Sequence, residues 1–175
     1  CDFKGIIEGL TKLPYDVALT HGHPDHAGGI GQFDEVYIHP ADTAMSTHIP
    51  YEQRVQYGEI MRNMNIGYKN VWGYTKDDVA KYTKKPKIKL LSDEQVFDLG
   101  GRKVTVYQAP GHSPGSVVFL DDQSRIHFSG DAANTNVGTS IAVSTTLRYL
   151  IRLQKLSTQY DRMYTGHIAY AGTIN

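Results

Sequence analysis

A short segment of the chain concentrates side chains that bind metal ions. Residues 21–26 read His-Gly-His-Pro-Asp-His, so three imidazoles and one carboxylate fall within six positions. Imidazole and carboxylate groups are ligands that zinc and other divalent transition metals accept. Alternate residues of an extended segment project to the same side, so His21 and His23 can share one ion. Asp25 and His26 follow round a turn toward a neighbouring position, and the spacing therefore allows two ions.

Three further candidate ligands follow predicted strands later in the chain. They are His112 in a Gly-His-Ser-Pro-Gly segment, Asp131 after Ser-Gly, and His167 after Tyr-Thr-Gly. Taken alone, each has an ordinary alternative, which is a loop histidine or a turn aspartate. Their combination with segment 21–26 favours a shared metal site.

The order of these loops resembles the metallo-β-lactamase superfamily. In that family a His-x-His-x-Asp-His loop follows a buried strand, and later loops supply a third histidine, a bridging aspartate and a terminal Gly-His. The corresponding motifs here are segment 21–26, Gly111-His112-Ser113-Pro114-Gly115-Ser116, Ser129-Gly130-Asp131 and Tyr164-Thr165-Gly166-His167. The resemblance implies that the first ion is held by His21, His23 and His112, the second by Asp25, His26 and His167, and that Asp131 bridges them.

The resemblance also implies a dinuclear metal-dependent hydrolase. Two divalent ions, with zinc preferred and iron or manganese as alternatives, would share a hydroxide, because coordination lowers the pKa of water from about 15.7 toward 7. Asp25 would orient this hydroxide, and Asp131 would hold both ions. The implied substrate is a small ester, thioester or lactone, as in the glyoxalase II and lactonase group of the family.

Other activities of the superfamily fit the residues less well. Zinc β-lactamases of the commonest class use a cysteine ligand near the position of Asp131, and Cys1 is the only cysteine here. Flavodiiron-type oxygen reductases carry glutamate at the position of His23. Three alternatives stay open: a phosphodiesterase or nuclease, a mononuclear iron oxygenase similar to the persulfide dioxygenases, and metal binding without turnover.

The composition of the chain disfavours nucleic acid and membranes as partners. Lysine plus arginine balance aspartate plus glutamate at 18 each, so no net positive charge attracts nucleic acid. No apolar run reaches the roughly 20 residues that span a bilayer, which predicts a soluble protein. The small-molecule substrate is what the resemblance implies. The residues do not fix the localisation, for which the cytoplasm is slightly favoured. Cys1 excludes an intrachain disulfide and is expected to be inert. The chain does not begin with methionine, so we expect residues upstream in the natural protein.

The first half of the chain predicts alternating helices and strands around segment 21–26. Phe3, Ile6, Ile7 and Leu10 form one helix face, and the following ranges predict a buried strand at 15–20, a strand at 36–39, a short helix at 41–47 and a helix at 52–64. Residues 49–90 read as an insertion. Its lysines, Lys81, Lys84, Lys85, Lys87 and Lys89, predict a solvated face, and Tyr68, Trp72 and Tyr74 predict a packed aromatic cluster.

The second half predicts an antiparallel meander followed by a helix and a last strand. The strands are expected at 95–99, 103–109, 116–121, 125–129 and 162–165, with a Gly100-Gly101 turn, and the helix runs from a cap at Ser144 or Thr145 to about Leu156. We predict one α/β domain over residues 1–175. The resemblance implies a four-layer αβ/βα sandwich that lacks its first strands, since only 20 residues precede His21. His39, His48 and His127 match no ligand position and are predicted to be surface or hydrogen-bonded structural residues.

Overall fold

The computed structural model describes residues 2–46, 49–64, 75–82, 84–133, 138–167 and 172–173. Its strands are β1 (Glu35–Ile38), β2 (Lys87–Leu90), β3 (Val96–Asp98), β4 (Lys103–Gln108), β5 (Val117–Asp121), β6 (Ile126–Gly130), β7 (Arg162–Thr165) and β8 (Gly172–Thr173). Its helices are α1 (Phe3–Leu10), α2 (Pro24–Ala27), α3 (Thr43–Ser46), α4 (Tyr51–Met64) and α5 (Val143–Gln154), with 3-10 turns η1 (Ile30–Gln32), η2 (Pro40–Asp42), η3 (Lys76–Asp78) and η4 (Ser157–Gln159).

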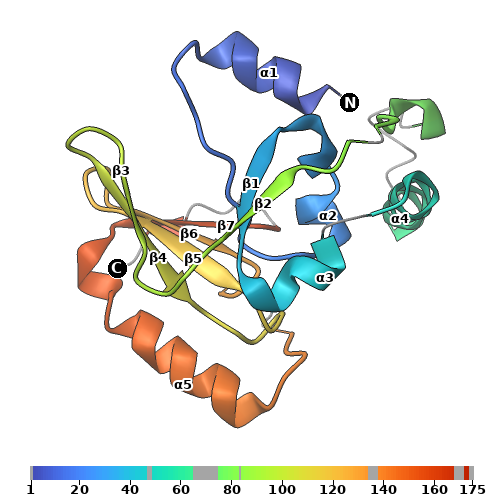
Figure 1. Cartoon of the computed structure of the whole chain (residues 1–175). Helices are drawn as coiled ribbons and strands as arrows, with labels where there is room; N and C mark the ends of the chain where they lie inside the picture. The colour runs from blue at the N-terminus through green and yellow to red at the C-terminus, as the bar shows by residue number, and fades with distance from the viewer. Residues whose placement is uncertain are drawn as a thin grey trace.

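The strands form two sheets. β1 and β2 pair in parallel, and β3 to β8 form a six-stranded sheet in sequence order. The pairs within β3–β6 are antiparallel, as predicted, whereas β6 and β7 run parallel. α5 covers one side of the larger sheet, and α2 and α3 lie beside β1 (Figure 1).

Three hydrophobic clusters separate four layers. Leu19, Ala27, Phe33, Val36 and Ile38 belong to the cluster between α2, η1 and the small sheet. The two sheets meet through a second cluster, which includes Leu91, Val106, Val117 and Phe119. A third cluster, with Val118 and Leu153 among its members, joins the larger sheet to α5. All five residues of β5 are buried, because this strand has core on both faces. The α/β sandwich is confirmed.

The segment before the first ligand loop links the two sheets. Leu19 N donates to Tyr37 O at 2.9 Å on β1, and Val117 N of β5 donates to Thr20 O at 2.8 Å. Residues 15–20, predicted as a strand, contribute only one parallel bridge, between Ala18 and Tyr37. The chain leaves β1 at once to reach β5, so this segment is too short for a full ladder and delivers His21 to the junction between the sheets.

The structure corrects the prediction at β2 and at the start of α5. β2 lies inside the range read as an insertion, because its lysines are on a partly exposed strand and interrupt the apolar alternation. Lys87 pairs with Glu35 at 2.9 Å, which fits the predicted solvated face. The N-cap of α5 is Ala142, which makes no side-chain cap; Ser144 lies within the first turn, so the predicted cap was wrong.

Candidate metal centre

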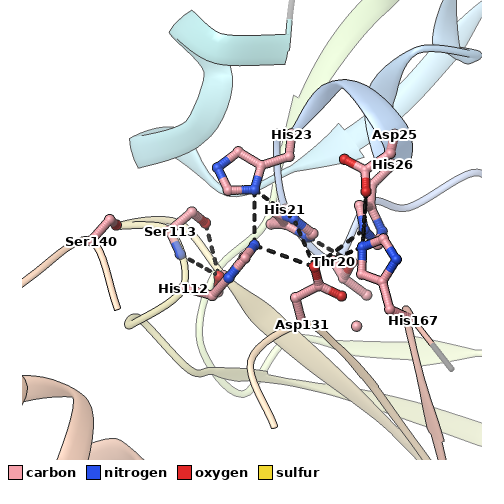
Figure 2. A network of polar contacts seen from close by, with 12 residues as sticks. Thr20, His21, His23, Asp25, His26, His112, Ser113, Asp131, Ser140 and His167 are labelled. Carbon is pink, nitrogen blue, oxygen red and sulfur yellow. Dashed lines mark hydrogen bonds and ion pairs between the residues drawn. The ribbon is translucent and has the colours of Figure 1, made fainter. Parts of the chain in front are cut away.

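All seven predicted ligands meet at one edge of the sandwich, on loops that follow strands and on the short helix α2 (Figure 2). His21 and His23 precede α2, and Pro24 begins that helix with its fixed φ. Asp25 and His26 lie on α2 itself. The other three follow β4, β6 and β7: His112, Asp131 and His167. The ligand atoms fall into two groups, within each of which they lie within 4.8 Å of one another.

The first group consists of three imidazoles. His23 Nδ1 lies 3.2 Å from His21 Nε2 and 2.9 Å from His112 Nε2. Burial lowers the pKa of His21 to about 3, and it lowers the pKa of His112 as well. Neutral imidazoles offer lone pairs, so this triangle of nitrogens has the chemistry of a divalent-metal site.

The second group combines two imidazoles with two carboxylates. His167 Nε2 lies 2.9 Å from Asp25 Oδ2 and 3.3 Å from His26 Nε2. His26 Nε2 lies 3.3 Å from Asp25 Oδ2. Asp25 and His167 are exposed, whereas His21 in the first group is buried. The second group therefore faces solvent and is the side that a substrate can reach.

One carboxylate oxygen lies between the two groups. Asp131 Oδ2 is 3.3 Å from His112 Nε2 in the first group and 3.1 Å from His167 Nε2 in the second. The other oxygen, Asp131 Oδ1, is buried without a hydrogen-bond partner in the described part of the chain. A buried carboxylate oxygen without a partner costs free energy that a cation would recover, so the donor set fits bound metal.

In the second group, the Asp25 carboxylate and the His26 imidazole stabilise each other's charged forms. Burial alone would lower the pKa of His26, but Asp25 and Asp131 more than offset this, and its pKa is raised. Burial alone would raise the pKa of Asp25, but hydrogen bonds from His26 and from the Tyr57 hydroxyl keep it well below its ordinary value. Asp25 is thus an anion over the physiological pH range, as a ligand or proton acceptor must be.

Glycines make room for the ligand loops. A Cβ on Gly166 would lie 2.3 Å from Asp131 Oδ1 and 2.6 Å from His26 Cε1. Gly130 has a φ of +50°, and a Cβ there would lie 2.5 Å from Thr20 Oγ1. Only glycine allows the backbone to approach this closely and turn in this way.

Sequence analysis missed Tyr57. This residue lies on α4, inside the range read as an insertion, and its hydroxyl hydrogen-bonds to Asp25. Burial and the Asp25 charge raise its pKa to about 12, so it stays a hydrogen-bond donor. α4 contacts α2, the helix that carries Asp25 and His26. No sequence motif indicates which tyrosine of α4 lies toward the site.

Two further described histidines, His39 and His127, belong to neither ligand group. His39 Nδ1 accepts from Ala41 N at 3.3 Å, which confirms a hydrogen-bonded structural role. His127 is 1% exposed, stacks on Tyr160 at 4.7 Å, and has no hydrogen bond on either ring nitrogen among the described residues. Its predicted surface or hydrogen-bonded role was therefore wrong. Cys1, His48, Tyr68, Trp72 and Tyr74 lie outside the described residues.

Residues 14–169 match the family model described as the metallo-beta-lactamase superfamily. The chain belongs to the metallo-β-lactamase superfamily. This confirms the resemblance read from the four ligand loops. None of the helices in the described ranges is long and apolar enough to cross a membrane.

Curated relatives include an acyl-coenzyme A thioesterase, MBLAC2. The Gallus gallus protein is 29% identical over 162 residues, which cover 89% of this chain and 55% of the relative. The Homo sapiens protein is 33% identical over 127 residues, covering 71% of this chain and 43% of the relative. The chain thus spans about half the length of these relatives.

Solved structures of the superfamily share the fold. The di-iron-bound form of TTHA1623 is 26% identical, with a TM-score of 0.62 and coverage of 97% of this chain and 78% of its own. An archaeal superfamily protein from Sulfolobus tokodaii, 20% identical, has a TM-score of 0.59 over 91% of this chain and 63% of its own. These likenesses confirm the metallo-β-lactamase fold.

Proposed function

We propose that this chain is a dinuclear metal-dependent hydrolase that acts on a small thioester, or on a related ester or lactone. One observation carries the dinuclear part of the proposal. Asp131 Oδ2 lies within 3.3 Å of a ligand nitrogen in each of the two groups, so a single carboxylate is shared between a three-imidazole site and a mixed imidazole–carboxylate site.

A thioester substrate is favoured because the curated relatives are thioesterases. The MBLAC2 proteins, at 29–33% identity, are acyl-coenzyme A thioesterases, and thioesters were among the substrates expected from the motifs. The balanced charge of 18 basic and 18 acidic residues gives no support to a nucleic-acid substrate. We therefore rank a small-molecule thioester above a phosphodiester.

Each ligand has a proposed role. His21, His23 and His112 would hold one ion, and Asp25, His26 and His167 the other, with Asp131 between them. Zinc suits these ligands, and the di-iron form of TTHA1623 keeps iron as an alternative. Bound divalent ions would supply an acidified water and polarise the scissile carbonyl.

The chain's own side chains would orient the reactants. The Asp25 carboxylate is ionised and partly exposed, so it can orient the attacking water on the solvent side of the centre. The Tyr57 hydroxyl donates to the same carboxylate and fixes its direction. Burial disfavours the protonated form of His21 and lowers its pKa to about 3, so this imidazole offers a lone pair to an ion at neutral pH.

Metal content and thioester hydrolysis test the proposal together. We would measure metal per chain by elemental analysis of protein purified without added metal, and hydrolysis of short-chain and long-chain acyl-coenzyme A before and after chelation. Two ions per chain and a chelator-sensitive thioesterase activity are expected, both lost in Asp131→Ala. Protein without metal, or turnover that survives Asp131→Ala, would contradict the proposal. One iron per chain with oxygen consumption would favour the oxygenase instead.

A further inference from the structure

A fully buried carboxylate stands behind the first ligand group. Asp42 is 0% exposed and ends the short turn η2. Its Oδ2 accepts from Gly22 N at 3.0 Å and from Ser113 Oγ at 2.5 Å, and its Oδ1 accepts from Gly115 N at 2.7 Å. A buried carboxylate needs such donors, and here three are provided by two loops.

The donors belong to the loops that carry the three imidazoles. Gly22 lies between His21 and His23, and Ser113 directly follows His112. Asp42 is 20 residues from Gly22 and 71 from Ser113, so one side chain fastens together two segments that are distant in the sequence. The junction therefore links the loops whose imidazole nitrogens lie 3.2 Å (His21) and 2.9 Å (His112) from His23 Nδ1.

The loops that contain Gly22 and Gly115 pack closely against Asp42. A Cβ on Gly22 would lie 2.9 Å from the Asp42 carbonyl oxygen, and one on Gly115 would lie 2.6 Å from Asp42 Cγ. Ser116 extends the junction, because its Oγ accepts from Ser113 N at 3.0 Å and lies 2.8 Å from Ser113 Oγ. Since the Ser113 hydroxyl donates to Asp42, the Ser116 hydroxyl is the donor to Ser113.

The junction acts on only one of the two ligand groups. In the described part of the chain, every side-chain hydrogen bond of the Asp42 carboxylate goes to the two loops of the first group. The second group is held by other contacts, namely the Tyr57 hydroxyl on Asp25 and the close approach of Gly166. Loss of Asp42 should therefore affect the two sites unequally.

We propose that Asp42 is a positioning residue that sets the metal affinity of the three-imidazole site without contacting the metal. The inference rests on the proposed dinuclear function. Partners that orient metal ligands through hydrogen bonds typically change metal affinity about 10–100-fold when they are removed. Asp42 acts on the backbone and hydroxyl next to the ligands rather than on the imidazoles themselves.

Asp42→Asn is the first test. The variant keeps the shape of the side chain, but its amide group meets N–H or O–H donors where the carboxylate accepted from them, so at least one of the three hydrogen bonds is lost. We would titrate metal-free protein with Zn²⁺ against a competing chelator. The expected result is two tight ions in the wild type, against one tight ion and one bound about 10–100-fold more weakly in Asp42→Asn.

Asp121→Asn is the matched control. Asp121 is also buried, at 2% exposed, and its Oδ1 accepts from Gln123 N at 3.1 Å and Ser124 N at 3.2 Å in a turn between β5 and β6. This variant should lower the denaturation temperature of metal-free protein while both ions bind as in the wild type. It separates loss of a buried carboxylate in general from loss of the junction.

Ser113→Ala covers the case in which Asp42→Asn does not fold. It removes the 2.5 Å bond to Asp42 and leaves the two backbone donors, so a smaller loss of affinity at the same single site is expected. Two equally tight ions in both variants, with only the denaturation temperature lowered, would overturn the inference and leave the dinuclear hydrolase standing. A wild-type protein that binds no ion would overturn the proposed function and the inference together.

Discussion

Asp131 is the residue on which the two ligand groups depend most. It is 4% exposed, one of its oxygens has no hydrogen-bond partner among the described residues, and the other lies near nitrogens of both groups. Asp25 and Asp131 outweigh the effect of burial and raise the pKa of the neighbouring His26, so protons on this imidazole balance part of the carboxylate charge. A bound ion replaces those protons, so metal binding at this centre releases protons and tightens as the pH rises toward neutrality.

His23→Ala tests the first group at its centre. His23 Nδ1 lies within 3.2 Å of both other imidazole nitrogens, so its loss removes the middle ligand and leaves a cavity at a half-buried position rather than in the core. Metal-dependent turnover should be abolished while far-ultraviolet circular dichroism stays close to that of the wild type. Full activity in this variant would refute the ligand assignment.

Gly166→Ala tests the close approach in the second group. The added Cβ would lie 2.3 Å from Asp131 Oδ1, so the carboxylate or the loop before His167 must move. A displacement on the order of 1 Å at a reacting centre costs about 100-fold in rate, and a loss of that size in kcat/KM is expected. Gly138→Ala is the control, because nothing lies within 4 Å of its Cβ. Equal activity of the two variants would show that the loop accommodates the methyl group.

The metal-ligand residues could be predicted from the sequence, but the residues that hold them in position, Asp42 and Tyr57, could not. Histidines and aspartates after strands have side-chain chemistry that the sequence displays, and all seven meet at one edge. Asp42 and Tyr57 act through hydrogen bonds to backbone donors or to a ligand carboxylate, and no spacing of residue types marks such partners. Glycines on both sides of the ligand loops were the available signal, since they indicate close backbone packing.

Among the elements, α4 contributes more to the site than its pattern indicates. Tyr57 is half-buried and donates to Asp25, although the helix as a whole has no clear apolar stripe. Its bounds, Tyr51–Met64, agree with the prediction, because boundaries depend on helix propensity and the preceding Pro50. The orientation of its residues depends on contacts with α2, which the sequence of the helix does not specify.

Tyr57→Phe tests this contribution of α4. The variant removes the hydroxyl that fixes Asp25, so the second site should bind its ion about tenfold more weakly, while the first site is unchanged. Tyr51→Phe is a control on the same helix, because the Tyr51 hydroxyl donates to Lys76 O at 3.1 Å, outside the metal centre. Metal titration against a competing chelator would compare the two variants. Equal metal affinities at the second site in Tyr57→Phe and Tyr51→Phe would show that Tyr57 has no role there.

At the scale of the whole molecule, the four layers bury His127, which belongs to neither ligand group. His127 lies on β6 of the larger sheet and stacks on Tyr160, and burial lowers its pKa to about 4. In the unfolded chain its pKa is near 6.5, so the unfolded state takes up a proton first as the pH falls. The free energy of unfolding is therefore unaffected by protonation of His127 above about pH 6.5. It decreases as the pH falls from 6.5 to about 4, because only the unfolded state binds the proton there.

His127→Phe should therefore reduce the acid sensitivity of the fold. Between pH 7 and pH 4.5 the wild type is expected to lose about 2.5 kcal/mol of unfolding free energy more than the variant, because only the wild type gains this proton on unfolding. Phenylalanine keeps the stacking on Tyr160. Urea titrations of metal-free protein at pH 7 and pH 4.5 would measure the difference, and since the ligand histidines titrate in both proteins, their effects cancel. Parallel pH profiles would contradict the buried, unpaired state of His127.

The distance along the chain between the ligands determines when each site becomes complete during synthesis on the ribosome. His23 and His112 are 89 residues apart, whereas His26 and His167 are 141 residues apart. The three-imidazole site has all its ligands once β4 and the loop after it have emerged, but the second site must wait for β7. If both ions bind as proposed, a nascent chain would capture them one after the other. The second ion would then close the loop between His26 and His167 and act as a late, reversible cross-link.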